Sequence, residues 1–328
     1  MKNKHYLLIL LPIFLLLIGC EGDSPRGLVK PFVPPSPGDI EVGNFQIHSE
    51  FSTYRTNMLG IDVASDGKIY AARSTQNFIQ VWSKPGVSLG TQPTIFDDPN
   101  APSSNSRFVS DRITTIPYQI YITEGSSVDG FFRNPKDVIY TTDIYVADTR
   151  NNRIQKFNSN FNFVRKWEDT KTRGVTSLAA RADTIFFTNK VGGNADNVRF
   201  LTPSGSIGTG FTVGAISGQD ALATDNNSGV YVSVRDAIQK WVRTSDIMWT
   251  MVWESTGFFF PSSLEFDDQN RLWVYDGGNN KIVLINPSNG VPILNDTINF
   301  VAGGFAFHNG FMYIADISNK RVVLATMD

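Results

Sequence analysis

The sequence predicts an all-β protein whose folded part is a six-bladed β-propeller. Three observations lead to this class. Short runs of β-branched and aromatic residues alternate with polar ones between Gly, Asn and Asp, and helical periodicity is nowhere sustained. One hydrophobic strand recurs at a mostly regular spacing. The last repeat lacks an outer strand, and a spare strand precedes the first repeat.

The recurring strand carries an aromatic residue, and the chain holds six copies of it. Successive aromatics are 75, 41, 45, 42 and 40 residues apart. A period of about 40 residues is typical of a propeller blade, which needs four short strands and the turns between them. The six aromatics are Tyr70, Tyr145, Phe186, Tyr231, Trp273 and Tyr313.

The 75-residue gap between the first two aromatics leaves room for a seventh blade. Residues 97–115 within it are rich in Asn, Ser, Pro and Asp and predict a loop insertion. A compact domain rarely keeps a blade without a strand signal. We therefore favour six blades over seven.

The clearest repeat, residues 134–167, shows how one blade is expected to be built. The last repeat contains the first three of these strands and ends without the fourth. We expect residues 45–51 to supply that outer strand, which covers two otherwise unpaired sheet edges. The expected strands are 137–140, 143–148, 153–157 and 163–167 in the clearest repeat, and 305–307, 312–316 and 321–325 in the last.

The repeat resembles that of the NHL family, most closely in IYVADTRNNRIQKF at residues 144–157. Residues 273–285 (WVYDGGNNKIVLI) and 313–324 (YIADISNKRVVL) resemble it too. Residues 127–138 (SVDGFFRNPKDV) look like the Gly-x-Phe-x-x-Pro lead-in of that family. The resemblance covers about 280 residues in six units and implies an NHL-like six-bladed propeller.

An aspartate recurs at the end of this strand, as Asp148, Asp276 and Asp316, whereas two other units have Asn189 and Val234 there. Before a Gly/Asn-rich turn, such an aspartate can accept backbone N–H bonds and hold the turn. We expect this structural role, because catalytic groups are not repeated from blade to blade. The basic residues positioned to pair with them are Arg153, Lys281 and Arg321.

The chain begins with the features of an export signal. Lys2 and Lys4 precede an apolar run over residues 7–18, shorter than a membrane span of about 20 residues. The run ends in Leu-Ile-Gly-Cys, which resembles a bacterial lipobox. We therefore expect a signal peptide at 1–19 and a lipid on Cys20, with fatty acids such as palmitate. The alternative is a chance cysteine after an ordinary cleavage site, but Cys20 is the only cysteine and forms no internal disulfide.

Residues 20–43 are expected to form the lipidated cysteine and a Pro/Gly/Ser-rich tether to a folded domain at 44–328. This predicts a lipoprotein of the cell envelope, held to a membrane by its lipid, with the choice between inner and outer membrane left open. The net charge is −2, from 29 basic and 31 acidic residues without a Lys/Arg cluster. This balance argues against a nucleic-acid partner.

Six-bladed propellers include enzymes, namely the gluconolactonase/regucalcin group, the paraoxonases and the peptidyl-hydroxyglycine lyases, whose sites use a metal in the channel. A zinc site of the lyase kind needs converging histidines. Only His48 and His308 follow the expected signal peptide. His48 falls on the expected outer closing strand, and His308 precedes a hairpin-type Asn-Gly pair. The sequence therefore predicts no zinc site, and a lipidated Cys20 leaves no thiol nucleophile.

A calcium site built from carboxylates is the remaining candidate for chemistry. Asp62, Asp137 and Glu265 fall on positions of the innermost strands that alternate toward the channel, where Ca²⁺ could be bound. We favour the alternative that these side chains simply contact channel water, because Ca²⁺ takes about 6–8 oxygen ligands. Apolar residues fill the corresponding positions elsewhere, namely Ile139, Ala179, Ala223 and Ala306.

These observations favour a non-enzymatic binding scaffold for a protein, peptide or glycan, using a face of the propeller or the 97–115 insertion. A metal-dependent lactonase or lyase that uses the channel carboxylates is the alternative. A purely structural envelope component is a third possibility.

Overall fold

The structure, a computed structural model, is described over most of the expected propeller domain. The expected signal peptide, Cys20 and the tether lie outside the described residues. No helix among the described residues is long and apolar enough to cross a membrane. The described residues are 45–52, 58–82, 94–97, 107–110, 117–118, 129–190, 197–213 and 221–327.

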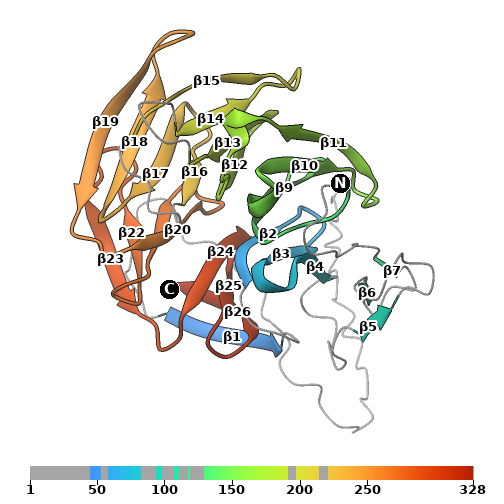
Figure 1. The fold of residues 1–328 in the computed structure, drawn as a ribbon. Coiled ribbons are helices and arrows are strands. Elements are labelled where there is room, and N and C mark those ends of the chain that lie inside the picture. Colours follow the sequence, from blue (N-terminus) through green and yellow to red (C-terminus); the bar gives the residue numbers. More distant parts are fainter. Residues whose placement is uncertain are drawn as a thin grey trace, which may run out of the picture. The chain divides into compact units, whose positions relative to one another are not determined.

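Six antiparallel sheets form blades around a channel, which confirms the predicted all-β propeller (Figure 1). Strands that follow one another in sequence pair within a blade, because short turns join antiparallel neighbours. Within the described residues, the first blade has three strands and the other five have four.

The first three blades contain β2 (Met58–Val63), β3 (Ile69–Arg73) and β4 (Phe78–Trp82); β8 (Pro135–Tyr140), β9 (Ile144–Asp148), β10 (Arg153–Phe157) and β11 (Phe163–Glu168); and β12 (Leu178–Arg181), β13 (Thr184–Thr188), β14 (Val198–Leu201) and β15 (Ile207–Phe211). The last three contain β16 (Leu222–Thr224), β17 (Gly229–Val234), β18 (Ala237–Arg243) and β19 (Trp249–Thr256); β20 (Pro261–Phe266), β21 (Leu272–Asp276), β22 (Lys281–Ile285) and β23 (Pro292–Thr297); and β24 (Ala302–His308), β25 (Phe311–Asp316), β26 (Arg321–Met327) and β1 (Phe45–Ser52).

The closing strand is confirmed. β1 pairs antiparallel with β26, from Phe45 opposite Met327 to Ser52 opposite Arg321. The register shifts once, between Ile47 and Ser49. The sixth blade therefore joins the two ends of the propeller sequence, and its third strand gains a partner for its backbone groups.

The expected loop insertion is only partly a loop, so that prediction was wrong in part. Residues 94–118 contain β5 (Thr94–Asp97), β6 (Arg107–Ser110) and β7 (Pro117–Tyr118), which pair as an antiparallel sheet of their own. Strands of four residues or fewer, set among polar residues, are too short to show a period-two pattern.

Aromatic side chains of the recurring strand fill the spaces between blades. Tyr70 of β3 is buried in a cluster with Val138 and Ile144 of the second blade. Trp273 of β21 is buried in the same way against Phe305 of the sixth blade. Burying a large apolar side chain contributes about 1.5–3 kcal/mol. These contacts hold neighbouring blades together.

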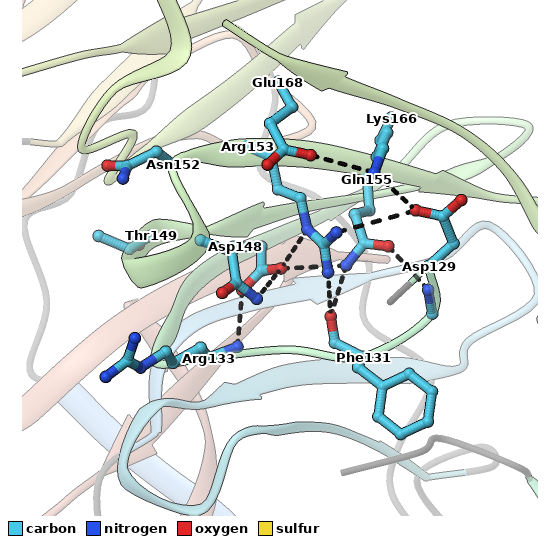
Figure 2. A network of polar contacts seen from close by, with 12 residues as sticks. Asp129, Phe131, Arg133, Asp148, Thr149, Asn152, Arg153, Gln155, Lys166 and Glu168 are labelled. Atoms are coloured by element: carbon cyan, nitrogen blue, oxygen red, sulfur yellow. Dashed lines mark hydrogen bonds and ion pairs between the residues drawn. The ribbon is translucent and has the colours of Figure 1, made fainter. Parts of the chain in front are cut away.

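Asp148 lies at the centre of a buried polar network in the second blade (Figure 2). Its carboxylate accepts hydrogen bonds from the Arg133 amide at 2.7 Å, from Arg153 Nε at 2.7 Å and from Gln155 Nε2 at 3.1 Å. Arg153 and Gln155 also donate to the Phe131 carbonyl, each at 2.7 Å. The network joins the loop that leads into β8 to the second and third strands of the blade.

All three recurrent aspartates also bind the turns that follow them, in agreement with the predicted structural role. Asp316 accepts the Asn319 amide at 2.9 Å, Asp276 accepts Asn279 Nδ2 at 2.8 Å, and Asp148 accepts Asn151 Nδ2 at 2.9 Å. Lys281 departs from the expectation, because it forms no ion pair with Asp276 in the described part of the chain.

Candidate functional site

The channel contains a cavity of about 510 Å³, lined by the innermost strand of every blade. These strands are the inner edges of their sheets, so part of their backbone has no partner within its own blade. Polar side chains that point across the channel wall can therefore bind the backbone of the next blade. The innermost strands are β2, β8, β12, β16, β20 and β24.

The structure brings all three predicted carboxylates to this cavity. Strand pairing places Asp62 opposite Tyr70 and Glu265 opposite Trp273, so these two occupy one structural position in their blades. Asp137 lies opposite Ala147, two residues nearer the start of its strand. The residues at the Asp62 position in the other blades are Ile139, Ala179, Ala223 and Ala306, as expected.

Two of the carboxylates connect adjacent blades. Asp62 accepts the amide of its own neighbour Val63 at 2.7 Å and the Tyr140 amide of the second blade at 2.6 Å. Asp137 accepts the Val138 amide at 2.9 Å and, on the third blade, the Leu178 amide at 2.7 Å. Both oxygens of each aspartate are therefore engaged by backbone N–H groups.

Neutral side chains connect two other pairs of blades. Thr224 donates its hydroxyl proton to the Ala180 carbonyl at 2.7 Å, and Ser263 accepts the Phe305 amide at 3.3 Å. A connection between innermost strands therefore does not need a carboxylate. A neutral side chain could make the connection between blades that Asp62 makes, so this connection alone does not explain a carboxylate at position 62.

The three carboxyl groups hold protons more tightly than is usual. Burial raises the pKa of Asp62 to about 7, against the lowering effect of its two backbone hydrogen bonds. Burial, together with the nearby charge of Asp62, also raises the pKa of Asp137 to about 7. Burial and the same charge raise the pKa of Glu265 well above its ordinary value. Lys136 is the basic residue among the described residues that line the cavity.

Among the described residues, no group of three or more His, Cys, Asp or Glu side chains is arranged to hold a metal ion. His308, the last residue of β24, forms a 2.9 Å contact with Asn309 of the turn that follows. His48 lies on β1, the outermost strand of the sixth blade. His48 is thus on the outer closing strand, as predicted, and His308 is not among the described residues that line the cavity.

One mouth of the cavity carries exposed apolar side chains that the sequence reading missed. Phe259 is 49% exposed and Phe260 is 51% exposed, and their rings lie 4.7 Å apart. Val301 of the adjacent sixth blade is 51% exposed and lines the cavity with Phe260. We call Phe259, Phe260 and Val301 the apolar rim.

Strand register identifies the residues of the second blade that correspond to Phe259 and Phe260. Phe260 precedes Pro261, which lies opposite Asp276, just as Asn134 precedes Pro135, which lies opposite Asp148. The second blade thus presents Arg133 and Asn134 where the fifth presents two phenylalanines. The signal in the sequence was the run Phe258–Phe260 before a proline, in which Phe258 is buried and the other two side chains are half exposed.

Phe260 is held in a left-handed backbone conformation, with φ at +54°. Asn134 has nearly the same φ, +51°, and asparagine adopts this region more readily than phenylalanine. A residue with a Cβ loses about 1–2 kcal/mol there. Phe161 is also left-handed, but its ring packs 6.4 Å from Tyr70 in the core. The half-exposed ring of Phe260 has no comparable burial to offset the strain.

Two glycines form the seat of the rim. The Gly278 amide donates to the Phe259 carbonyl at 2.6 Å, and the Gly277 amide donates to the Phe260 carbonyl at 3.1 Å. A Cβ on Gly278 would lie 2.0 Å from Cδ1 of Phe259. The turn after β21 therefore needs glycine at position 278, because a side chain there would overlap the Phe259 ring.

A second set of exposed apolar side chains lies on the outer strands of the fourth and fifth blades. We call it the outer patch; its side chains are between 43% and 74% exposed. Its members belong to the β18–β19 hairpin and to the start of β23, away from the channel. The outer patch consists of Ile247, Met248, Met251, Val252, Val291 and Ile293.

Comparisons with known proteins show the fold alone. No family model and no curated protein matches the chain, so the resemblance to NHL repeats remains a prediction. The structure is similar to virginiamycin B lyase from Staphylococcus aureus, with a TM-score of 0.55 and 17% identity over 87% of this chain and 100% of the lyase. It is similar to a streptogramin B lyase, with a TM-score of 0.53 and 13% identity over 87% of this chain and 98% of that chain. A chain of the mitotic checkpoint complex aligns with a TM-score of 0.54 and 8% identity, over 95% of this chain and 99% of its own.

Proposed function

We propose that this protein is an exported, lipid-anchored propeller of the cell envelope that binds a protein, peptide or glycan at the mouth of its channel. The carrying observation is the apolar rim, in which Phe260 stands half exposed on a strained backbone. Exposed rings and left-handed phenylalanine both lower the stability of the free protein. Strain of this kind clusters at ligand sites, where binding can offset it.

A ligand that covers the apolar rim would remove its exposed side chains from water, which favours binding. Covering apolar surface contributes about 25 cal/mol per Å². Aromatic residues are enriched in protein interfaces for this reason. The Gly277 and Gly278 amides hold the backbone of Phe260 and Phe259 in place before binding, which reduces the entropy lost on association.

The likeness to the lyases does not by itself support catalysis. A virginiamycin B lyase variant from Staphylococcus aureus, solved with quinupristin, is catalytically inactive and has one histidine changed to alanine. In this chain His48 lies on the outermost strand of the sixth blade, and His308 contacts Asn309 at a turn. No histidine occurs among the described residues that line the cavity.

A metal-dependent lactonase or lyase using Asp62, Asp137 and Glu265 is the second candidate. The cavity of about 510 Å³ has the size of a small-molecule site. Carboxyl groups with a pKa of about 7 also suit general acid–base catalysis. We rank this candidate second because the oxygens of both aspartates already accept backbone amides.

Site-specific photo-crosslinking in the producing cell tests the binding proposal. A photoreactive amino acid replaces Phe260 in one variant and Val252 of the outer patch in the other. We expect a discrete, light-dependent adduct from position 260 and none from position 252. Adducts from position 252 alone would place the binding surface on the outer patch, and the proposal would be wrong.

The anchor is tested separately. Changing Cys20 to Ala should abolish labelling by radioactive palmitate and release the protein into the soluble fraction. A Cys20→Ala variant that is still labelled would refute the lipoprotein assignment. Its propeller should melt with the parent, because Cys20 precedes the folded domain.

A further inference from the structure

The ligand of the channel mouth can be described more closely, provided that the proposed binding function holds. Two surfaces of different chemistry meet at this mouth. The apolar rim covers the fifth and sixth blades, which adjoin through the contact between Ser263 and Phe305. Below it, the cavity is lined by Asp62, Asp137 and Glu265. An occupant that reaches both surfaces must combine an apolar group with a polar one.

The charge of the cavity decides the sign of that polar group. Three carboxyl groups line it, and Lys136 is the basic residue among its described lining. Arg133 is exposed at the corresponding mouth position of the second blade, outside the cavity lining. The described cavity lining therefore has three acidic groups and one basic group, and a cationic group from outside favours the ionised form of the carboxyl groups and complements it.

The carboxylates also keep hydrogen-bonding capacity. A carboxylate oxygen can accept more than one hydrogen bond. Each Asp62 and Asp137 oxygen accepts one backbone amide, and the Ser177 side chain also hydrogen-bonds to Asp137. Among the described residues, only Oε1 of Glu265 accepts a backbone amide, from Phe266 at 3.3 Å. An ammonium or guanidinium group, with several N–H donors, can use this remaining capacity.

The depth of the carboxylates fits a long basic side chain. Asp137 lies two residues along β8 from Pro135, where the strand begins at the mouth. At about 3.4 Å per residue, its Cα is about 7 Å inside. A lysine has a flexible four-carbon stem between its backbone and its charge, and such stems lie readily along apolar surface. The charge can therefore enter while the backbone of the partner stays on the rim.

We propose that the channel mouth docks an exposed segment of a partner protein in which a lysine or arginine lies within two residues of an apolar side chain. The basic side chain enters the channel toward Asp137 and Glu265. The apolar side chain packs on Phe259, Phe260 and Val301.

The test uses a library of random hexapeptides with blocked termini, presented to the full-length protein in detergent. Retained sequences should be enriched at least threefold in Lys or Arg within two positions of Phe, Leu, Ile or Met. The best retained peptide is then synthesised and its Kd measured against variants with confirmed melting curves. We expect binding at least tenfold weaker to D137N/E265Q and to F260N, and within twofold of the parent for V252A.

The outcomes separate this inference from the function on which it rests. Retained peptides that are acidic or uncharged, or that bind D137N/E265Q as well as the parent, overturn the basic-segment proposal. If their binding still depends on Phe260, the mouth remains a binding site. Retention that ignores Phe260 overturns both statements. A library from which nothing is retained overturns this inference, while the crosslinks at position 260 decide the function independently.

Discussion

Asp148 and Asp137 belong to neighbouring strands of the same blade, yet their surroundings differ in one decisive respect. Asp148 faces a cation, because Arg153 Nε donates to it at 2.7 Å (Figure 2). Asp137 is bound by the Val138 and Leu178 amides instead, and the charge of Asp62 works against its ionisation. Burial raises the pKa of both carboxyl groups, but Arg153 opposes this rise at Asp148, whereas no cation opposes it at Asp137.

This difference distinguishes the residues that hold each blade together from the residues that serve one site. The Asp148 arrangement recurs at Asp316 with Arg321, so it belongs to the construction of a blade. Asp137 has no acidic counterpart at its strand position, and among the described residues the apolar rim occurs only at the fifth and sixth blades. In a repeat protein, groups that weaken the structure without being repeated indicate function.

The largest effect should come from removing the strand that closes the ring. Deletion of residues 44–53 removes β1 and leaves the backbone of β26 without its partner. Each unpaired buried group costs about 1–3 kcal/mol, against a total of about 5–15 kcal/mol. We expect aggregation or a much lower Tm in circular dichroism. Deletion of residues 21–40 is the control and should leave Tm unchanged; equal melting of both variants would contradict the closure.

The same chemical change at the two aspartates of the second blade tests the comparison itself. Asp148→Asn removes the carboxylate that lies 2.7 Å from the buried Arg153 guanidinium and leaves it the half-exposed Asp129 at 3.8 Å; breaking a buried pair costs about 3–5 kcal/mol. Asp137→Asn removes a buried charge that has no cation and keeps one acceptor oxygen. We expect the second change to lie within about 1 kcal/mol of the parent in urea unfolding at pH 8. Equal losses at both sites would show that the comparison is wrong.

A smaller effect is expected from pH. The folded protein holds protons on Asp62 and Asp137 up to a pKa of about 7, whereas the ordinary value is 3.8. The stabilisation is therefore complete below about pH 4 and is lost as the pH rises through 7. We expect a Tm several degrees lower at pH 8 than at pH 5, with Glu265 contributing in the same direction.

The triple variant D62N/D137N/E265Q is the matched control for that slope, which should become much flatter. The parent and this variant should both melt independently of Ca²⁺ and EDTA. A parent that loses several degrees in EDTA, with a triple variant that does not respond, would support the metal-dependent candidate. Bound metal at 100 times its Kd stabilises by about 2.7 kcal/mol, which is large enough to detect.

Much of this molecule could be predicted from the sequence, because repetition supplies several readings of the same signal. The period of the aromatics predicted the blades, and the missing last strand predicted the pairing of β1 with β26. Asp62, Asp137 and Glu265 were placed in the channel because their strands alternate in a regular way.

The features that the sequence did not predict are departures from the repeat. The three strands within 94–118 are too short for a periodic signal. The apolar rim was missed because an apolar run at a strand start resembles core, and only the structure shows that Phe259 and Phe260 remain half exposed. Proton affinities near neutral pH depend on burial and mutual charge, which a one-dimensional pattern does not contain.

The central claim is that the rim serves binding and not stability, and the unfolding free energy of Phe260→Asn tests it most directly. The change installs the residue that the second blade holds as Asn134 at nearly the same φ. Relief of strain should outweigh the lost contact with the Phe259 ring, so we predict a free energy of unfolding equal to the parent or higher by up to about 1 kcal/mol. A loss of about 2 kcal/mol or more would show that Phe260 supports the fold, and the account of the channel mouth as a binding site would be contradicted.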